Sequence, residues 1–345
     1  MPDQSKAGEV LQDEEAVIRL LEPLAQAAGA FALKDDCAIF RPRPGTDLVL
    51  KTDPIAEGVH FLAGADPADV AWKALAVNLS DLAAKGATPS AYLLALSFPT
   101  APPRDWVVAF AQGLREAQEA FGCHLLGGDT DRRPGPLSVA ITAIGTVPRG
   151  GMVRRATARA DHGLFVSGTL GDAALGLQLA KDATRAAAWD LSPDMLRHLS
   201  DRYRRPQPRL ALTGALRAHA SAAMDLSDGL AKDLGRMCQA SGCAARVDLA
   251  DLPLSPAARK VVAAEARQYH RILAAGDDYE ILASIAPAKE AAFRQAAAVA
   301  GVAVARIGHM TAGSGVALTG LDGERIDLTR TGWDHFASGM DDAGA

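Results

Sequence analysis

The spacing of apolar residues along the chain predicts alternating helices and strands. Residues 13–28 carry apolar side chains at helical spacing, and Pro23 is expected to kink or end that helix. Residues 67–85 form a second predicted helix, which Asp66 caps and Gly86 follows. Further helices are predicted at 106–121, 171–180, 192–220 (broken by Pro206 and Pro208) and 229–240, and strands at 48–50, 92–98, 124–126, 137–144, 163–167, 222–224 and 281–285. This alternation predicts an α/β (α+β) fold.

A turn cluster at residues 148–151 separates two such strand-rich units. A chain of 345 residues is also long enough for about two domains. We therefore predict one domain over residues 1–148 and a second over 149–345. The small, polar tail from Ala337 is expected to fray.

Charge and composition exclude several classes of protein. Thirty-six Lys and Arg against 41 Asp and Glu give a net charge of −5, so the chain has no overall attraction to nucleic acid or to an anionic membrane. The four cysteines form no CxxC pair, which disfavours a disulfide framework or a structural zinc site. There is neither a signal-peptide pattern nor an apolar run of 18 residues, so we expect a cytoplasmic protein.

Aspartates at the ends of apolar segments are the unusual feature of the chain. A carboxylate near a core is costly unless it is paired, caps a helix or binds a metal. Each one alone is more simply a cap or turn residue, but the set, with little His or Cys nearby, points to Mg²⁺. These aspartates are Asp35, Asp36, Asp53, Asp81, Asp129, Asp225, Asp228, Asp277 and Asp278.

Four short segments that contain these aspartates each allow more than one interpretation. Asn78 and Asp81 share one helix face, where they need a metal or a hydrogen-bond network unless the face is exposed. Residues 127–130 (GGDT) are expected in a loop that admits a phosphate or simply turns the chain. In 225–229 (DLSDG), Ser or Asp caps the next helix, or the helix N-terminus binds an anion whose Mg²⁺ the aspartates hold. Residues 276–280 (GDDYE) form a solvated turn or a site for a cationic ligand.

No P-loop, protein-kinase motif or strand-linked GxGxxG is present, so phosphate chemistry would need a less common scaffold. Together the motifs resemble those of thiamine-monophosphate kinases, in the superfamily of aminoimidazole-ribonucleotide synthetase, selenophosphate synthetase and a hydrogenase-maturation protein. The matching segments are KDDCAIF (34–40), TDPIAEGVHF (52–61), AWKALAVNLSDLAAKGATP (71–89), LLGGDTDR (125–132), SGTLGDAALGL (167–177), MDLSDGLAKDL (224–234), AGDDYEIL (275–282) and GWDHF (332–336).

The resemblance implies a reaction and an assembly. ATP would donate its γ-phosphoryl group directly to thiamine monophosphate, assisted by several Mg²⁺ ions, for thiamine diphosphate biosynthesis. The N-terminal domain would bind metal and nucleotide and form the sheet of a homodimer. The C-terminal domain would close over nucleotide and substrate.

The resemblance also implies roles for individual residues. Metal roles fall on Asp36, Thr52, Asp53, Asp81, Asp129, Asp225 and Asp228, of which Asp81, Asp129 and Asp225 would be catalytic. Nucleotide contacts fall on Gly128, Asp129, Arg155 and Ser227. Substrate contacts fall on His60, Asp277 and Trp333.

The chain departs from the family pattern at four places. Lys34 occupies a position where the family usually has glycine. Lys51 occupies a position where the family commonly has a small hydroxyl residue, so one potential metal ligand is missing. Residues 156–158 (ATA) replace Ser-Gly-Ala, and Asp277 replaces a glutamate, which shortens the reach to the substrate. Sister enzymes of the superfamily fit less well because their signature cysteines are not found. A non-catalytic nucleotide sensor would not need the intact acidic set.

Overall fold

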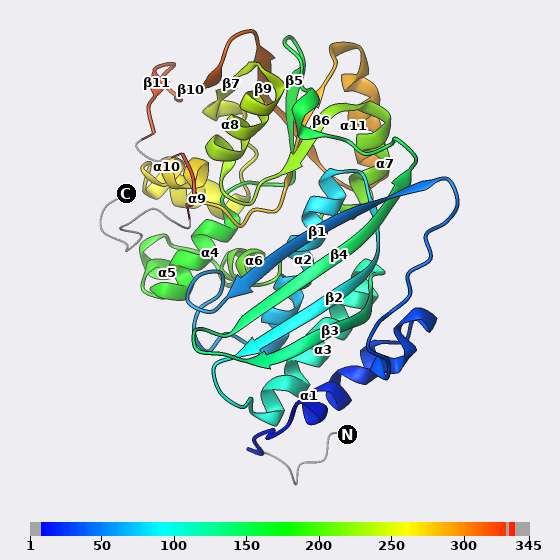
Figure 1. Cartoon of the computed structure of the whole chain (residues 1–345). Coiled ribbons are helices and arrows are strands. Elements are labelled where there is room, and N and C mark those ends of the chain that lie inside the picture. Colours follow the sequence, from blue (N-terminus) through cyan, green and yellow to red (C-terminus); the bar gives the residue numbers. More distant parts are fainter. Residues whose placement is uncertain (1–7, 329–330, 335–345) are drawn as a thin grey trace. The chain divides into compact units, whose positions relative to one another are not determined.

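The computed structural model describes residues 8–328 and 331–334, and it divides into two compact units (Figure 1). Unit 1 consists of Met1–Leu82 and Ala87–Gly151, and unit 2 of Ala83–Gly86 and Met152–Ala345. The division after Gly151 falls at the end of the turn cluster 148–151, whereas the sequence analysis put the boundary after residue 148. The tail from Ala337 lies outside the described residues.

Unit 1 is built on a four-stranded sheet in the order β1-β4-β2-β3. Its strands are β1 (Thr46–Ala56), β2 (Thr88–Phe98), β3 (His124–Arg132) and β4 (Ser138–Pro148). β4 pairs antiparallel with β1 and β2, whereas β2 and β3 are parallel. β1 and β3 are therefore the two edges of the sheet.

Helices cover one face of this sheet. α2 (Pro67–Ala84) and α3 (Arg104–Phe121) lie behind it in Figure 1, and α1 (Glu14–Leu21) packs on α3. Along β1, Val49 and Ile55 are buried, but Leu48 and Leu50 on the other face are exposed, as period-2 alternation requires. Short 3₁₀ segments follow α1 at Glu22–Leu24 and Ala28–Leu33.

Local signals fixed the helix ends as predicted. The first helix stops at Leu21, before the 3₁₀ turn that contains Pro23. Asp66 caps α2, since its Oδ1 accepts a hydrogen bond of 2.8 Å from the Ala68 N–H.

The prediction of a loop between the strands at 124–126 and 137–144 is wrong in its first part, because β3 continues through the GGDT motif to Arg132. The cause is long-range pairing: Gly128 lies opposite Leu94 of β2 in the parallel ladder. A Cβ on Gly128 would lie 1.8 Å from the Leu94 carbonyl oxygen. The glycine therefore permits a close approach of two strands.

Unit 2 contains a seven-stranded sheet in the order β11-β10-β7-β9-β5-β8-β6. The strands are β5 (Gly163–Ser167), β6 (Ala220–Asp225), β7 (Ala244–Asp248), β8 (Ile281–Ile285), β9 (Val304–Thr311), β10 (Gly315–Thr319) and β11 (Arg325–Ile326). The helices are α4 (Asp172–Lys181), α5 (Arg185–Ala188), α6 (Pro193–Arg204), α7 (Thr213–His219), α8 (Leu230–Ser241), α9 (Pro256–Ala264), α10 (Gln268–Ala274) and α11 (Glu290–Val299), with 3₁₀ segments at Arg155–Thr157, Leu210–Leu212, Leu249–Asp251 and Pro287–Lys289.

Both faces of the second sheet are packed. Leu164 and Val166 of β5 belong to a core with α4, α8 and α9, whereas Phe165 belongs to a core with α7 and α11. This explains why β5 and β8 read as continuous apolar runs, and both were predicted with their observed bounds. The mixed α/β class with two units is confirmed.

Among the described residues, no helix is both long and apolar enough to cross a lipid bilayer.

Candidate active site

In unit 1, an ammonium group lies between two of the predicted aspartates. Lys51 Nζ is 3.0 Å from Asp53 Oδ2 and 2.7 Å from Asp81 Oδ2. Strand alternation places Lys51 and Asp53 on one face of β1, and Asp81 reaches them from α2. Burial lowers the pKa of the Lys51 ammonium, but the charges of Asp81 and Asp53, and the hydrogen bonds to them, outweigh burial and raise that pKa above its ordinary value.

Asn78 satisfies its polar groups in a network with the main chain. Its Oδ1 accepts from the Asp53 N–H at 2.8 Å, and its Nδ2 donates to the carbonyls of Asp53 at 3.2 Å and Ala74 at 3.0 Å. Of the alternatives that the sequence left open for this face, the network is observed for Asn78. It fixes β1 to α2 beside Asp81.

Thr52 and His60 use polar atoms locally. Thr52 points to the opposite face of β1 from Asp53, where its hydroxyl donates to the Ile141 carbonyl at 3.2 Å and accepts from Thr142 Oγ1 at 3.1 Å. The structure thus does not bring the Thr52 hydroxyl together with Asp53 and Asp81. His60 Nδ1 accepts from the Ala56 N–H at 3.0 Å, so a neutral His60 carries its proton on Nε2.

Two other predicted metal residues of unit 1 lie apart from this pair. Asp129 is on edge strand β3, and its Oδ1 accepts from the Thr130 N–H. Three strand spacings of about 4.8 Å separate β3 from β1, so Asp129 lies roughly 14 Å across the sheet from Asp53. Asp36 is exposed in the segment before β1. The neighbouring Lys34 has φ −100°, a conformation that needs no glycine.

In unit 2, Asp225 is the last residue of β6, and the loop between β6 and α8 carries Ser227 and Asp228. Asp228 Oδ2 pairs with Arg236 Nη1 at 2.7 Å and with Lys232 Nζ at 3.4 Å, both on α8. Gly229 occupies the cap position without a side-chain hydrogen bond, so neither Ser227 nor Asp228 caps the helix.

Asp233, which the sequence analysis missed, occupies the anion position at the start of α8. Its buried Oδ2 accepts from the main-chain N–H groups of Ser227 at 3.0 Å and Asp228 at 2.9 Å. Burial raises the pKa of Asp233 above its ordinary value. These two N–H groups, which could otherwise hold a phosphate, bind a carboxylate of the chain itself. The spacing Asp228-x₄-Asp233 was the only signal for it in the sequence.

The predicted substrate residues adjoin this loop. The Asp277 N–H donates to the Ser227 carbonyl at 3.0 Å, and Tyr279 Oη donates to Asp277 Oδ1 at 3.1 Å. The Trp333 N–H donates to the Asp228 carbonyl at 2.9 Å, and Lys232 Nζ donates to the Trp333 carbonyl. Unit 2 therefore brings Ser227, Asp228, Asp277 and Trp333 to one place.

A buried network of ion pairs around Glu280 supports the Ser227 loop. The sequence analysis did not predict this network. Glu280 is fully buried and accepts from Arg202 at 2.8 Å, from Arg209, and from Ser167 Oγ at 2.6 Å. The Glu280 carbonyl in turn accepts from the Leu226 N–H at 2.8 Å. The network thus joins the strand after the GDDYE motif to the loop that contains Ser227.

Arg155 lies at the other end of α8. Its carbonyl accepts from Ser241 Oγ at 3.0 Å, at the C-terminus of the helix. Because α8 has 12 residues, about 18 Å of helix separates that end from the Ser227 loop. The structure does not place Arg155 beside Ser227.

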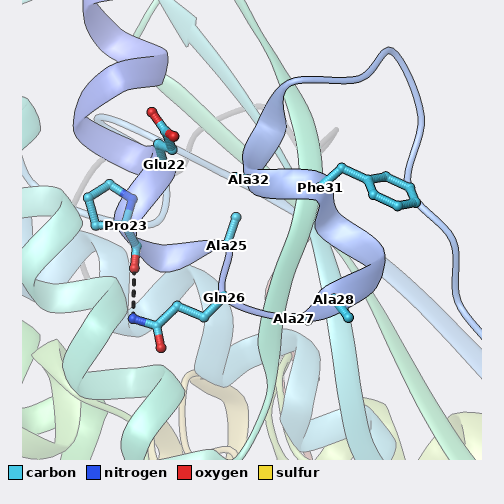
Figure 2. A pocket seen from close by; sticks show the side chains of 8 residues that line it. All are labelled: Glu22, Pro23, Ala25, Gln26, Ala27, Ala28, Phe31 and Ala32. Atoms are coloured by element: carbon cyan, nitrogen blue, oxygen red, sulfur yellow. Dashed lines mark hydrogen bonds between the residues drawn. The ribbon is translucent and has the colours of Figure 1, made fainter.

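Metal ligands do not form a ready-made cluster. Within residues 8–328 and 331–334, no three His, Cys, Asp or Glu side chains are grouped so that they could hold a metal ion. The hollow in Figure 2, about 460 Å³ beside Glu22 and Phe31 in unit 1, is lined mainly by alanines and contains none of the predicted site residues.

The chain is similar to known proteins over most of its length. The model "AIR synthase related protein, N-terminal domain" matches residues 34–147, and the corresponding C-terminal domain matches residues 159–320. A thiamine-monophosphate kinase from Caulobacter vibrioides is 43% identical over 323 residues, which cover 92% of this chain and 89% of the relative.

Solved structures give the same result. The crystal structure of thiamine-monophosphate kinase from Stenotrophomonas maltophilia K279a has a TM-score of 0.76 and 39% identity, covering 85% of this chain and 90% of that one. The structure of AaThiL complexed with AMPPCP and TMP has a TM-score of 0.74 and 30% identity, covering 86% and 89%.

Proposed function

Since the chain belongs to the thiamine-monophosphate kinase family, we propose that it transfers the γ-phosphoryl group of ATP to thiamine monophosphate, forming thiamine diphosphate and ADP. Curated relatives carry this activity in their names, and the related AaThiL is described in complex with AMPPCP and TMP. Phosphoryl transfer of this kind depends on positioning and on charge neutralisation more than on covalent help from the protein.

The observation that carries the proposal is the meeting of Ser227, Asp228, Asp277 and Trp333 in unit 2. The main chains of Asp277 and Trp333 both bind this loop, and a carboxylate and an indole suit the cationic thiazolium and flat pyrimidine rings of thiamine. We therefore propose that Asp277 and Trp333 contact thiamine monophosphate, and we assign the same role to His60 on the family resemblance alone. We propose that the nucleotide is contacted by Ser227, Gly128, Asp129 and Arg155. Arg155 would do so from the opposite end of α8 from Ser227.

Carboxylates of the chain fit Mg²⁺, because hard oxygen donors are its preferred ligands. Asp53 and Asp81 already share a cation, the Lys51 ammonium, which shows that this place stabilises positive charge. Bound Mg²⁺ would neutralise the phosphates and bring the two anionic substrates together. We propose Asp36, Asp53, Asp81, Asp129, Asp225 and Asp228 as ligands of several Mg²⁺ ions, with Asp81, Asp129 and Asp225 closest to the reaction. Thr52 would first have to release its bonds within the sheet.

We also propose that unit 1 forms a homodimer through the face of its sheet that α2 and α3 leave bare. Leu48, Leu50 and Leu93 are exposed on that face, and Leu50 is 65% exposed. Three exposed leucines on one sheet are a surface that a second copy would bury. Sedimentation should show a dimer for the natural chain and a monomer for Leu50→Asp. A dimeric Leu50→Asp variant would remove this face from the interface.

Unit 1 is thus the proposed metal-binding and dimerisation domain, and unit 2 the domain that closes over nucleotide and substrate. We also propose a cytoplasmic location, as the sequence analysis expects.

A single-turnover assay tests the function. The chain is held in excess over thiamine monophosphate, with saturating ATP and Mg²⁺, and the products are separated by chromatography. We expect thiamine diphosphate and ADP in equal amounts. Formation of ADP without thiamine diphosphate would contradict the kinase assignment. Binding of ATP without any turnover would favour a nucleotide sensor.

A further inference from the structure

Lys51 stands where the acidic site of unit 1 needs positive charge. Its Nζ bridges Oδ2 of Asp53 and Oδ2 of Asp81, one from β1 and one from α2. The lysine is on the same face of β1 as Asp53 because the two are separated by one residue. The Lys51 side chain therefore reaches both carboxylates from its position on β1, without any rearrangement of the sheet.

The geometry of this bridge is that of an ammonium and not of a metal ion. The two oxygens lie 3.0 and 2.7 Å from Nζ, whereas Mg²⁺ requires oxygen ligands at about 2.0–2.1 Å. A divalent ion placed between the same two oxygens would have to expel the ammonium, since two cations cannot share the position. Asn78 holds the main chain of Asp53 against α2, which keeps the pair at this spacing.

An ammonium has three N–H donors, and two of them are used here. The side chain of Lys51 is 29% exposed, so the third donor can reach a ligand. Lysine binds phosphate as a point charge, and this is the chemistry that a nucleoside triphosphate or a phosphate monoester brings.

We propose that the Lys51 ammonium permanently occupies the cation position between Asp53 Oδ2 and Asp81 Oδ2, so that no divalent ion binds there and the third N–H of Lys51 meets a substrate phosphate. This inference rests on the proposed function, because it concerns the cations that accompany ATP. Other oxygens of the site, such as Asp81 Oδ1, remain able to bind Mg²⁺ from the side of the phosphates.

The test counts bound Mn²⁺ by electron paramagnetic resonance, with a non-hydrolysable ATP analogue present. Lys51→Ser should bind one more Mn²⁺ per chain than the natural protein, because it vacates the position. Lys51→Arg keeps the charge and should show the natural count. The matched control is Lys260→Ser, which breaks an exposed Lys–Asp pair with Asp190 in unit 2 and should also leave the count unchanged.

Equal counts for the natural chain and Lys51→Ser would overturn the proposal. A Lys51→Ser variant that stays unfolded at saturating Mn²⁺ would also overturn it, since the ion should then replace the ammonium. Formation of thiamine diphosphate by the natural chain is measured separately, so a failure of the metal count is distinguishable from a failure of the proposed function.

Discussion

Asn78 binds the main chain of Asp53 in both directions, accepting from its N–H at 2.8 Å and donating to its carbonyl at 3.2 Å. β1 is an edge strand, so these main-chain groups have no neighbouring strand on that side. A single buried amide of α2 takes the place of that strand. The relationship ties the position of Asp53 to that of Asp81, one helical turn away from Asn78.

Asn78→Leu should therefore destabilise the protein. The Asp53 N–H and carbonyl would lose their partner, at a cost of about 1–3 kcal/mol. For domains of this size each kcal/mol lowers the melting temperature by about 2–4 °C, so calorimetry should show a fall of roughly 2–12 °C. The control is Gln112→Ala, which removes only an exposed hydrogen bond to Glu116. Equal melting temperatures for both variants would contradict this role of Asn78.

Asp81→Asn keeps the shape of the side chain but removes a charge from the pair around Lys51. We expect kcat to fall at least about 100-fold, as for other losses of preorganised charge in an active site, with an unchanged circular dichroism spectrum. Asp194→Asn, in an exposed pair with Arg197, is the matched control and should keep full activity. Normal turnover of Asp81→Asn at low Mg²⁺ would mean that Asp81 only stabilises the helix surface.

Asp277 should set the affinity for thiamine monophosphate. Asp277→Ala is expected to raise KM for this substrate about tenfold or more, since a charge-assisted contact is worth about 1.5–3 kcal/mol. Asp277→Glu should keep activity and tighten binding, because it restores the missing methylene. Tyr279→Phe removes the hydrogen bond to Asp277 but leaves the carboxylate. This variant distinguishes the effect of the orientation of the Asp277 side chain from the effect of its charge. An unchanged KM in the alanine variant would place Asp277 outside the site.

The pair of Asp172 and His198 should make stability depend on pH. Asp172 is buried and accepts from His198 at 3.0 Å, Ser255 at 2.5 Å and Thr169 at 2.5 Å. Burial raises the pKa of Asp172, but these hydrogen bonds outweigh burial and lower it, and the bond to Asp172 raises the pKa of His198.

The sign follows from proton linkage. The His198 contribution is complete below its unfolded pKa of about 6.5 and is lost as the pH rises through the raised folded value. The Asp172 contribution is lost at the acid end, as the pH falls through its lowered folded value. His198 is 43% exposed, so we expect less than about 1 kcal/mol. Melts from pH 6 to 8.5 should show a smaller decline for His198→Gln than for the natural chain or the exposed control His270→Gln; parallel declines would contradict the assignment.

Much of the fold could be predicted because its signals are local. Helix ends are set by residues close in sequence, as at Asp66, Pro23 and Ser192. The strands at 163–167 and 281–285 are continuous apolar runs. β7, β9 and β10 were not predicted, because they exist through pairing between residues about 60 positions apart or more, which no local signal reveals. β3 was cut short for the same reason: only its pairing with β2 keeps GGDT extended.

The sequence identified the acidic residues of the site but not their partners. Which face Thr52 and Asp53 present depends on strand register, which spacing alone does not give. Asp233 reaches back five and six residues to bind two N–H groups, a geometry that appears only once the loop is folded. Asn78 offered a stronger signal, since it is the only asparagine in the chain.

The fate of the γ-phosphoryl group of ATP is the most direct test of the proposed kinase activity. The natural chain is incubated with Mg²⁺, thiamine monophosphate and ATP that is radiolabelled at the γ position, and the label is followed by chromatography. We expect the label to enter thiamine diphosphate in a 1:1 ratio with the ADP formed, and Asp81→Asn to slow this transfer without changing its product. Label released as inorganic phosphate, with thiamine monophosphate left unchanged, would contradict the proposed activity.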